Sequence, residues 1–472
     1  MSDLVRVTPT TWSARGEAVV HGENRQMLLF GGIPGEEATA RVTFAGMHQV
    51  HAVFSSTDRP DAHRVEPPCE RFRPCGGCAI MHLDPSGQEA MRRSLVRSAL
   101  DEAGLVDVGI SAFHPSPDGL ADFRHVIKLG VGFSDHGHLR VGAWGRNNRR
   151  IVPIPRCNVA RQELRATMAS VAHHVIDLGI APYDPETDRG VLRAIVLRAS
   201  RTTGEVLITV VAGRKVRALQ DLAEAVGGSV GHVVGIWLHL NSEPGNGIYS
   251  RDGDGAVGVV PMLGKGWIEE QMNGLSLRVG PVDFFQTNPS MAEVLYRRAV
   301  SRMALDNTTP VLDLYCGVGG IALHAAREAG FVIGVEENDA AVQRARENAH
   351  NNGLAAEFQA GRVEDLLPEL VRKLSGARPV VSVNPARRGL EPGVVASIHN
   401  LDPRRVVYVS CNPRAMARDL AMFVERGYRV GSIELFDMFP NTPHVECIAV
   451  VESADPTPAS RRAPRRSVVR PG

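Results

Sequence analysis

Cysteines are the residues of this sequence whose positions most directly suggest chemistry, and Cys411 is the first of them. Residues 406–409 form an apolar, β-branched run that predicts a buried strand. Asn412 is a good N-cap and Pro413 suits the first helical position, so Cys411 should stand just before a helix N-terminus. The positive end of that helix favours a thiolate, and we expect Arg414 to lower the thiol pKa further. The alternative is an inert, buried cysteine.

A second group of cysteines predicts a metal centre. Cys69, Cys75 and Cys78 follow the spacing C-x5-C-x2-C in a loop with proline and two glycines, and Cys157 supplies a fourth thiol. Thiols this close in sequence can share one centre. Four thiolates suit zinc or an iron–sulfur cluster, and their spacing does not choose between the two. Unrelated cysteines are the alternative interpretation.

A glycine-rich turn predicts a nucleotide-type ligand. Residues 311–326 combine a buried strand, a glycine turn and the start of a helix, the first βα unit of a doubly wound sheet. The turn has the form G-x-G-x-x-A from Gly317 to Ala322, and Glu336 ends the next strand. S-adenosylmethionine and NAD both carry a ribose diol that needs a carboxylate acceptor, so the pattern alone fits either.

Three further polar residues stand beside apolar runs in the same half of the chain. Asn384 follows the strand at 380–383, at the type of strand end where open α/β sheets bind ligands. Gln286 precedes the first strand, which places it at the mouth of the same crevice. Glu446 separates two apolar runs, in a pattern that resembles a hairpin near the end of the sheet.

The whole chain predicts a protein of about three domains. It has 472 residues, a formal net charge of +1 and seven cysteines, and the length suggests several separate cores. The charge neither supports nor excludes RNA as a partner. The sequence shows no signal peptide and no run of about twenty apolar residues, which predicts a cytoplasmic protein without membrane contact. An odd number of unevenly spaced cysteines argues against a disulfide framework.

We expect four segments. Short alternating runs across residues 4–57 predict a small antiparallel β-barrel at 1–58. Residues 59–275 should form a mixed domain that carries the cysteine loop, with helices at 88–102 and 216–226 and strands that include 247–250. Residues 276–452 should form an α/β domain. Residues 453–472, rich in proline, serine and arginine, predict a disordered basic tail.

Five motifs of the second half occur together. DFFQTN, DLYCGVGG, VNPARRG, SCNP and DMFPNTPHVE resemble, in this order, the motifs of the S-adenosylmethionine-dependent RNA uracil-5-methyltransferases. The cysteine group is similar to the four-iron, four-sulfur (4Fe-4S) site of the 23S ribosomal RNA branch of that family. The segment GGIPGEEATARV resembles part of a TRAM domain, a small OB-like RNA-binding barrel.

This resemblance implies a fold, an activity and roles for individual residues. The fold would be α/β, with a Rossmann-like class I methyltransferase domain, and the enzyme would methylate carbon 5 of a uridine, with 23S rRNA as its RNA partner. The implied residues are Cys411 as nucleophile, Glu446 as base, Gln286, Tyr315, Glu336 and Asn384 around S-adenosylmethionine, and Cys69, Cys75, Cys78 and Cys157 on the 4Fe-4S cluster.

Several alternatives stay open. The substrate could be tRNA, the chain could be a non-catalytic RNA-binding iron–sulfur protein, or the glycine turn could serve an NAD-dependent oxidoreductase. We expect a monomer. The chain has Asn384-Pro385-Ala386-Arg387 where many family members have Asp-Pro-Pro-Arg, and Gly320 where many have asparagine. Both forms resemble a ribosomal RNA subgroup that generally lacks an N-terminal barrel, so the target uridine is left open.

Overall fold

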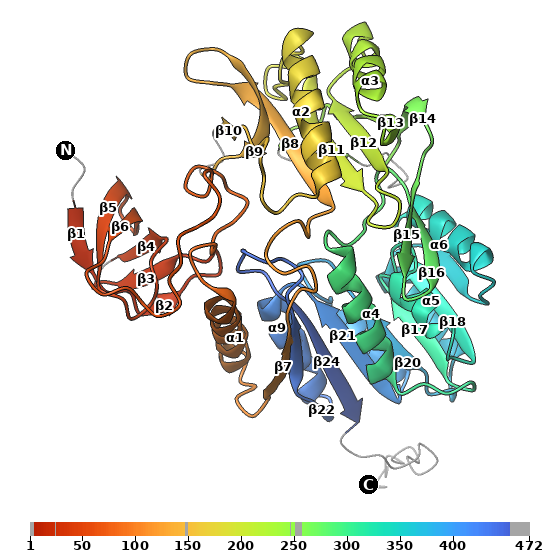
Figure 1. Cartoon of the computed structure of the whole chain (residues 1–472). Coiled ribbons are helices and arrows are strands. Elements are labelled where there is room, and N and C mark those ends of the chain that lie inside the picture. Colours follow the sequence, from red (N-terminus) through yellow and green to blue (C-terminus); the bar gives the residue numbers. More distant parts are fainter. Residues whose placement is uncertain (1–3, 24, 147–149, 246, 251–256, 454–472) are drawn as a thin grey trace, which may run out of the picture.

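A computed structural model describes residues 4–23, 25–146, 150–245, 247–250 and 257–453 (Figure 1). The predicted basic tail lies outside these residues, apart from Ser453 at the end of the last strand. In the described part of the chain, no helix has the length and apolar character needed to cross a membrane.

A six-stranded sheet forms the N-terminal unit, drawn in red in Figure 1. Its strands lie in the order β1-β5-β6-β4-β3-β2 around a small core of alanines and Leu29. Strands β4 and β6 pair in parallel, so the prediction of a wholly antiparallel arrangement was wrong at this pair. The bounds are β1 (Leu4–Val7), β2 (Thr11–Trp12), β3 (Ala18–His21), β4 (Gln26–Phe30), β5 (Ala38–Ala45) and β6 (Gln49–Ser56).

A seven-stranded sheet in the order β10-β9-β8-β11-β12-β13-β14 forms the central unit. Two helices, α2 and α3, cover one of its faces and share its main core. The helix expected at 216–226 is α3, whereas residues 247–250, expected as a strand, form none. The bounds are β8 (Val126–Phe133), β9 (Leu139–Trp144), β10 (Ile151–Val152), α2 (Gln162–Asp177), β11 (Leu192–Ala199), β12 (Val206–Ala212), α3 (Arg217–Ser229), β13 (Val233–Leu240) and β14 (Val260–Gly264).

The central sheet also holds the segment that leads into the C-terminal half. Arg198 of β11 is buried and donates a hydrogen bond to the backbone oxygen of Asp283 at 2.6 Å. Thr209 of β12 donates to the backbone oxygen of Pro281 at 2.7 Å. These buried bonds fix the backbone just before Gln286, because a carbonyl left unpaired in the interior would be costly.

The C-terminal unit is built on a nine-stranded sheet, which confirms the predicted doubly wound arrangement. The strand order is β19-β18-β17-β20-β21-β24-β23-β7, and β22 also pairs with β24. Strands β17 to β21 run parallel, and β24 runs antiparallel to β21. The bounds are β17 (Pro310–Leu314), β18 (Phe331–Glu336), β19 (Glu357–Ala360), β20 (Val380–Val383), β21 (Arg405–Ser410), β22 (Tyr428–Val430), β23 (Ile433–Phe436) and β24 (Glu446–Ser453).

Helices cover both faces of this sheet. Along β21, Val406 and Tyr408 belong to one core cluster, and Val407 and Val409 belong to the other, as the alternation of side chains along a strand requires. The first face packs against α7 (Val363–Lys373), α8 (Pro392–Asn400) and α9 (Pro413–Val424). The second packs against α4 (Pro289–Met303), α5 (Gly320–Ala325), α6 (Asp339–Asn351) and the hairpin of β15 (Ile268–Met272) and β16 (Leu275–Val279).

Two elements from far upstream complete this unit. Helix α1 (Pro85–Glu102) begins after the N-cap Asp84 and contributes Val96 and Leu100 to the core shared with α7, α8 and α9. Strand β7 (Ile110–His114) pairs in parallel with β23 at the sheet edge. The helix expected at 88–102 is therefore present. It packs on the C-terminal sheet, although it lies within the segment 59–275.

Close packing between α4 and α5 gives a first testable prediction. A Cβ atom at Gly320 would lie 2.9 Å from the hydroxyl oxygen of Tyr296. Tyr296 thus fills the space that the asparagine of many family members would need at this position. Gly320→Ala should therefore lower the free energy of unfolding by about 1–3 kcal/mol, as overpacking does. Urea denaturation measures this change. As a control, Gly393→Ala in α8 meets no atom within 4 Å and should gain up to about 1 kcal/mol. Equal stability of the two variants would contradict this packing.

Candidate active site

Sheet topology brings the two predicted reactive residues together. Parallel strands end at one edge of a sheet, and Cys411 follows the end of β21 at that edge. Strand β24 runs the other way and begins at Glu446, and its register pairs Ser410 with Cys447. Cys411 and Glu446 are therefore neighbours across two adjacent strands.

The turn around Cys411 has the predicted form, but its electrostatics differ. Asn412 is the N-cap of α9 and accepts a hydrogen bond from the backbone nitrogen of Arg414 at 3.2 Å. Burial and the nearby Glu446 raise the pKa of the Cys411 thiol, and Arg387 partly opposes them. Arg414 instead pairs with Glu102 at 3.3 Å. The prediction that Arg414 would lower this pKa was wrong, because its side chain turns toward α1.

Glu446 is a buried acid. Its residue is only 4% exposed, and burial raises the pKa of its carboxyl to about 8, against the opposing charge of Arg387. A neutral carboxyl is the form that a low-dielectric site favours. At neutral pH the site therefore holds a thiol and a carboxylic acid side by side, each one deprotonation away from reacting as nucleophile or base.

Arg387 is the cation that acts on both groups. Its side chain bonds to Cys411, and its charge lowers the pKa of both Cys411 and Glu446. Its backbone oxygen accepts a hydrogen bond from Asn412 Nδ2 at 2.7 Å, which ties the loop after β20 to the Cys411 turn. The sequence analysis gave Arg387 no role. The available signal was its place in a loop at the carboxyl end of a strand next to β21.

The glycine turn and Glu336 lie together at the same edge of the sheet. Glu336 accepts hydrogen bonds from the backbone nitrogens of Gly317 at 3.2 Å and Asn338 at 3.0 Å. Gly317 and Gly319 have φ angles of +56° and +89°, a conformation that glycine adopts without strain. Tyr315 has a φ of +63° and donates to Glu364 at 3.3 Å. Strained non-glycine residues of this kind often mark functional sites.

The other two predicted residues lie in different segments of the fold. Asn384 follows β20, and its backbone nitrogen donates to the backbone oxygen of Leu314 at 3.3 Å, which places it beside the end of β17. Gln286 is buried just ahead of α4. Among the described residues, no hydrogen bond joins Gln286 to Tyr315 or Asn384.

Asp313 is a site residue that the sequence analysis missed. It lies in β17 beneath the glycine turn and is 1% exposed. Burial raises its pKa to about 7, and the charge of Glu336 adds to this effect, while Ser382 and the backbone of Ala322 oppose it. The signal was available, because an acid inside an otherwise apolar strand is unusual.

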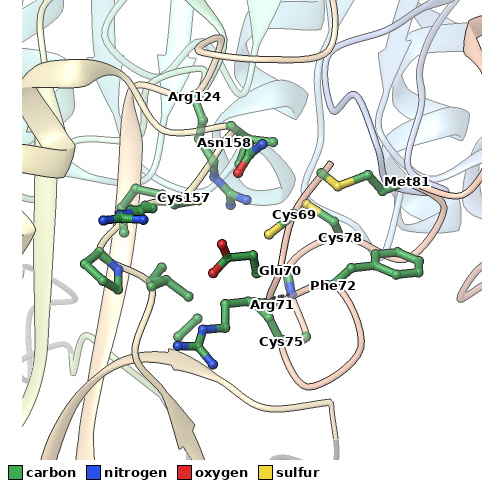
Figure 2. Close-up of a pocket in the computed structure, with 18 of the residues that line it drawn as sticks. Cys69, Glu70, Arg71, Phe72, Cys75, Cys78, Met81, Arg124, Cys157 and Asn158 are labelled. Carbon is green, nitrogen blue, oxygen red and sulfur yellow. Dashed lines mark hydrogen bonds between the residues drawn. The ribbon is translucent and has the colours of Figure 1, made fainter. Parts of the chain in front are cut away.

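The four predicted cysteines gather at one pocket, as Figure 2 shows. The pocket has a volume of about 670 Å³ and includes Cys69, Cys75, Cys78 and Cys157 in its lining. Burial, followed by the charges of Cys157 and Cys75, raises the pKa of Cys78 to about 12. Thiols that influence one another in this way share one electrostatic environment.

Arg146 holds the cysteine loop in shape. One of its terminal nitrogens donates to the backbone oxygens of Phe72, Cys75 and Cys78, each at 3.0 Å. Its guanidinium also lies 3.4 Å from the ring centroid of Phe30 in β4, a cation–π geometry. Even so, no group of three or more acidic, histidine or cysteine side chains among the described residues is arranged to hold a metal ion.

The fold and its similarity to known proteins define a class of protein. Residues 305–422 match a family model described as a methyltransferase domain. The whole architecture is similar to the crystal structure of the Pyrococcus abyssi tRNA (uracil-54, C5)-methyltransferase in complex with S-adenosyl-L-homocysteine. That likeness has a TM-score of 0.72 and 26% sequence identity, and it covers 95% of this chain and all of the other. The protein is therefore a class I, S-adenosylmethionine-dependent methyltransferase.

Sequence relatives give the family. An uncharacterized RNA methyltransferase of Gloeobacter violaceus is 32% identical over 95% of this chain and 96% of its own length. Another, from Listeria innocua, is 31% identical over 92% and 94%. The chain belongs to the family of S-adenosylmethionine-dependent RNA methyltransferases.

The two arginines near Cys411 give the second prediction. Arg387→Met should raise the pKa of Cys411, because it removes the cation that opposes the effects of burial and of Glu446 on this pKa. Alkylation of the Cys411 peptide, followed by mass spectrometry across a pH series, should be severalfold slower at neutral pH and reach its plateau at higher pH. Arg414→Met is the matched control and should leave this profile unchanged. A shifted profile in Arg414→Met with an unchanged one in Arg387→Met would instead show that Arg414 lowers the pKa of Cys411.

Proposed function

We propose that this protein transfers a methyl group from S-adenosylmethionine to carbon 5 of a uridine in RNA. The observation that carries the proposal is the facing pair Cys411 and Glu446, placed with Arg387 at the sheet edge where the glycine turn and Glu336 also lie. The five sequence motifs and the uracil-C5 activity named for the Pyrococcus abyssi enzyme support it. We assign the methyl transfer to residues 276–452.

The proposed chemistry follows from the weak nucleophilicity of carbon 5 of uracil. The Cys411 thiolate adds to carbon 6, which makes carbon 5 enolate-like. Carbon 5 then attacks the sulfonium methyl group, and S-adenosylhomocysteine leaves. Glu446, as carboxylate, takes the carbon 5 proton, and the electrons of that C–H bond restore the double bond while the C–S bond to Cys411 breaks.

The electrostatics of the free protein suit this sequence of steps. The raised pKa of Glu446 means that the carboxylate, once formed in a buried site, is a strong proton acceptor. Arg387 stabilises negative charge on either partner, so it favours first the thiolate and later the carboxylate. We assign Gln286, Tyr315, Glu336 and Asn384 to the methyl donor, with Glu336 as the acceptor for the ribose hydroxyls.

RNA recognition is assigned to the first two segments. Residues 1–58 are proposed to be a TRAM-like module, whose β5–β6 hairpin exposes Phe44 (61%) and Met47 (82%). In the segment 59–275, Arg71, Arg124 and Lys128 line the cysteine pocket and offer positive charge to phosphates. The target base must leave its stack, which favours a loop or remodelled RNA as substrate.

We also propose that Cys69, Cys75, Cys78 and Cys157 hold a 4Fe-4S cluster. The donor set fits, because four thiols line one pocket and Arg146 and Arg124 supply nearby positive charge. The cluster would supply a rigid cross-link between the loop at 69–78 and the segment that precedes α2.

The nature of the RNA gives two candidates. We propose 23S rRNA, on the cysteine group and the TRAM-like segment that resemble that branch of the family. The second candidate is tRNA, which is favoured by the extent of the likeness to the Pyrococcus abyssi enzyme. Mapping of 5-methyluridine in RNA from a deletion strain distinguishes them.

The two-step mechanism gives the third prediction. Glu446→Gln should still form the thioether and accept the methyl group, but release of product should fall by about 10²–10⁴-fold without the base. Denaturing electrophoresis with substrate RNA and S-adenosylmethionine should reveal a protein–RNA adduct.

The double variant Glu446→Gln, Cys411→Ala is the control and should show no adduct. Normal turnover by Glu446→Gln without an adduct would remove this residue from the mechanism. If the wild-type protein binds RNA but transfers no methyl group to it, the result would instead favour a non-catalytic RNA-binding protein.

The cluster gives the fourth prediction. Protein purified without oxygen should be brown and contain iron and sulfide, as expected for a cubane held by four thiolates. Cys157→Ser should lower both the iron content and the melting temperature, because it unties the loop from the central sheet. Cys316→Ser is the control: Cys316 does not line the pocket, so this variant should keep its iron. Stoichiometric zinc without iron in the anaerobic protein would overturn the assignment.

A further inference from the structure

The loop at 437–445 sets the position of Glu446. It connects β23 to β24, and the last residue of β23, Phe436, pairs directly with Glu446. Glu446 is therefore the first residue after the loop, and any shift of the loop moves the start of β24. The buried residues Asp437, Asn441 and Thr442 show that the loop is enclosed by other parts of the protein.

Arg92 of α1 is the centre of the contacts that enclose this loop. Its side chain is fully buried and donates to the backbone oxygen of Thr442 at 3.0 and 3.2 Å. It also donates to the backbone oxygens of Phe439 and His444, both at 3.2 Å, and pairs with Asp437 at 3.1 Å. One guanidinium thus donates hydrogen bonds to three carbonyls along the loop and forms an ion pair with one carboxylate, in an interior where unpaired polar groups are costly.

Gln88, one turn earlier on α1, holds the middle of the loop. Its side chain donates to Asn441 Oδ1 at 3.2 Å and accepts from the Asn441 backbone nitrogen at 2.9 Å. Arg92 also donates to the Gln88 side-chain oxygen at 3.4 Å, so the two residues act as one unit. The Asn441 side chain donates in turn to the backbone oxygen of Leu120 at 2.8 Å.

The cysteine loop reaches the same point. The backbone nitrogens of Ala79 and Ile80 both donate to the backbone oxygen of Asn441, at 3.0 and 3.1 Å. These two residues directly follow Cys78. The loop that precedes Glu446 is therefore held by contacts from residues 79–120, more than 300 positions away in the chain.

Cys411 is fixed by different contacts. Its turn is capped by Asn412, whose side chain bonds to the Arg387 backbone. Neither residue belongs to the set Gln88, Arg92 and Asn441. Loss of the α1 contacts should therefore disturb the base while the nucleophile keeps its place.

We propose that Arg92, with Gln88, is a positioning residue for Glu446, and that these contacts make proton removal depend on the cysteine-bearing N-terminal half. This inference rests on the proposed function, because it assigns Glu446 the role of base. It predicts that loosening the loop affects the last step of the reaction more than the first.

The test is a single-turnover assay of the full-length Arg92→Met variant with substrate RNA and labelled S-adenosylmethionine. Methyl transfer into the covalent adduct should change by less than about threefold, whereas release of methylated RNA should slow by about 10–100-fold, as displacement of a catalytic group by about 1 Å does. The adduct should accumulate on a denaturing gel. Arg92→Lys, which keeps a buried cation, should restore part of the release rate.

Arg97→Met is the matched control on the same helix. Arg97 also donates to two backbone oxygens, those of Leu105 and Val108 at 2.9 and 2.7 Å, but it lies away from the loop at 437–445. This variant should lose stability without accumulating the adduct. Equal adduct levels in the two variants, or slow release in Arg92→Met with no adduct, would overturn the proposal.

A milder variant covers the case in which Arg92→Met fails to fold. Gln88→Met removes the amide pair with Asn441 and keeps Arg92, and it should show the same accumulation to a smaller degree. Normal release by a folded Gln88→Met variant would then overturn the proposal. If the wild-type protein transfers no methyl group and Glu446→Gln traps no adduct, the proposed function fails; if both succeed and Arg92→Met releases product normally, only this inference fails.

Discussion

Burial of a carboxyl group next to a thiol is the constraint on which the site depends. Glu446 is enclosed because β24 lies in the sheet interior, between β21 and β23. A low-dielectric position keeps the acid neutral and makes its conjugate base strong. It also makes the thiolate of Cys411 harder to form. Arg387, in an exposed loop, lowers the pKa of both Cys411 and Glu446. The site therefore combines a buried acid with a cation that remains partly hydrated.

The three structural units converge on a single sheet edge. The central sheet fixes the backbone before Gln286 through Arg198 and Thr209. Helix α1 and the segment after Cys78 hold the loop before Glu446. The C-terminal sheet thus carries the residues proposed to react, while the other two units determine where several of them lie. Contacts of this kind, from residues around a site, hold its side chains within a fraction of an ångström of the geometry that a reaction needs.

Local patterns predicted what local interactions determine. The βα turn around Gly317, the cap at Asn412 and the grouping of Cys69, Cys75 and Cys78 followed from short segments, because strand period, cap chemistry and thiol spacing are local properties. The parallel pairing of β4 with β6, the burial of Asp313 and the approach of Arg387 to Cys411 depend on contacts between distant segments. Arg414 shows the limit clearly: its sequence position favoured Cys411, but Glu102, some 310 positions away, decided its orientation.

Strand β7 has a consequence for synthesis of the protein. Its partner β23 lies about 320 residues downstream, and at about 5–20 residues per second a ribosome needs roughly 15–65 seconds to reach it. During that interval α1 and β7 leave the ribosome with apolar side chains such as Val96 and Leu100 uncovered. Until then, β7 must not pair with another strand. Folding of the C-terminal unit therefore waits until the last strands have been made.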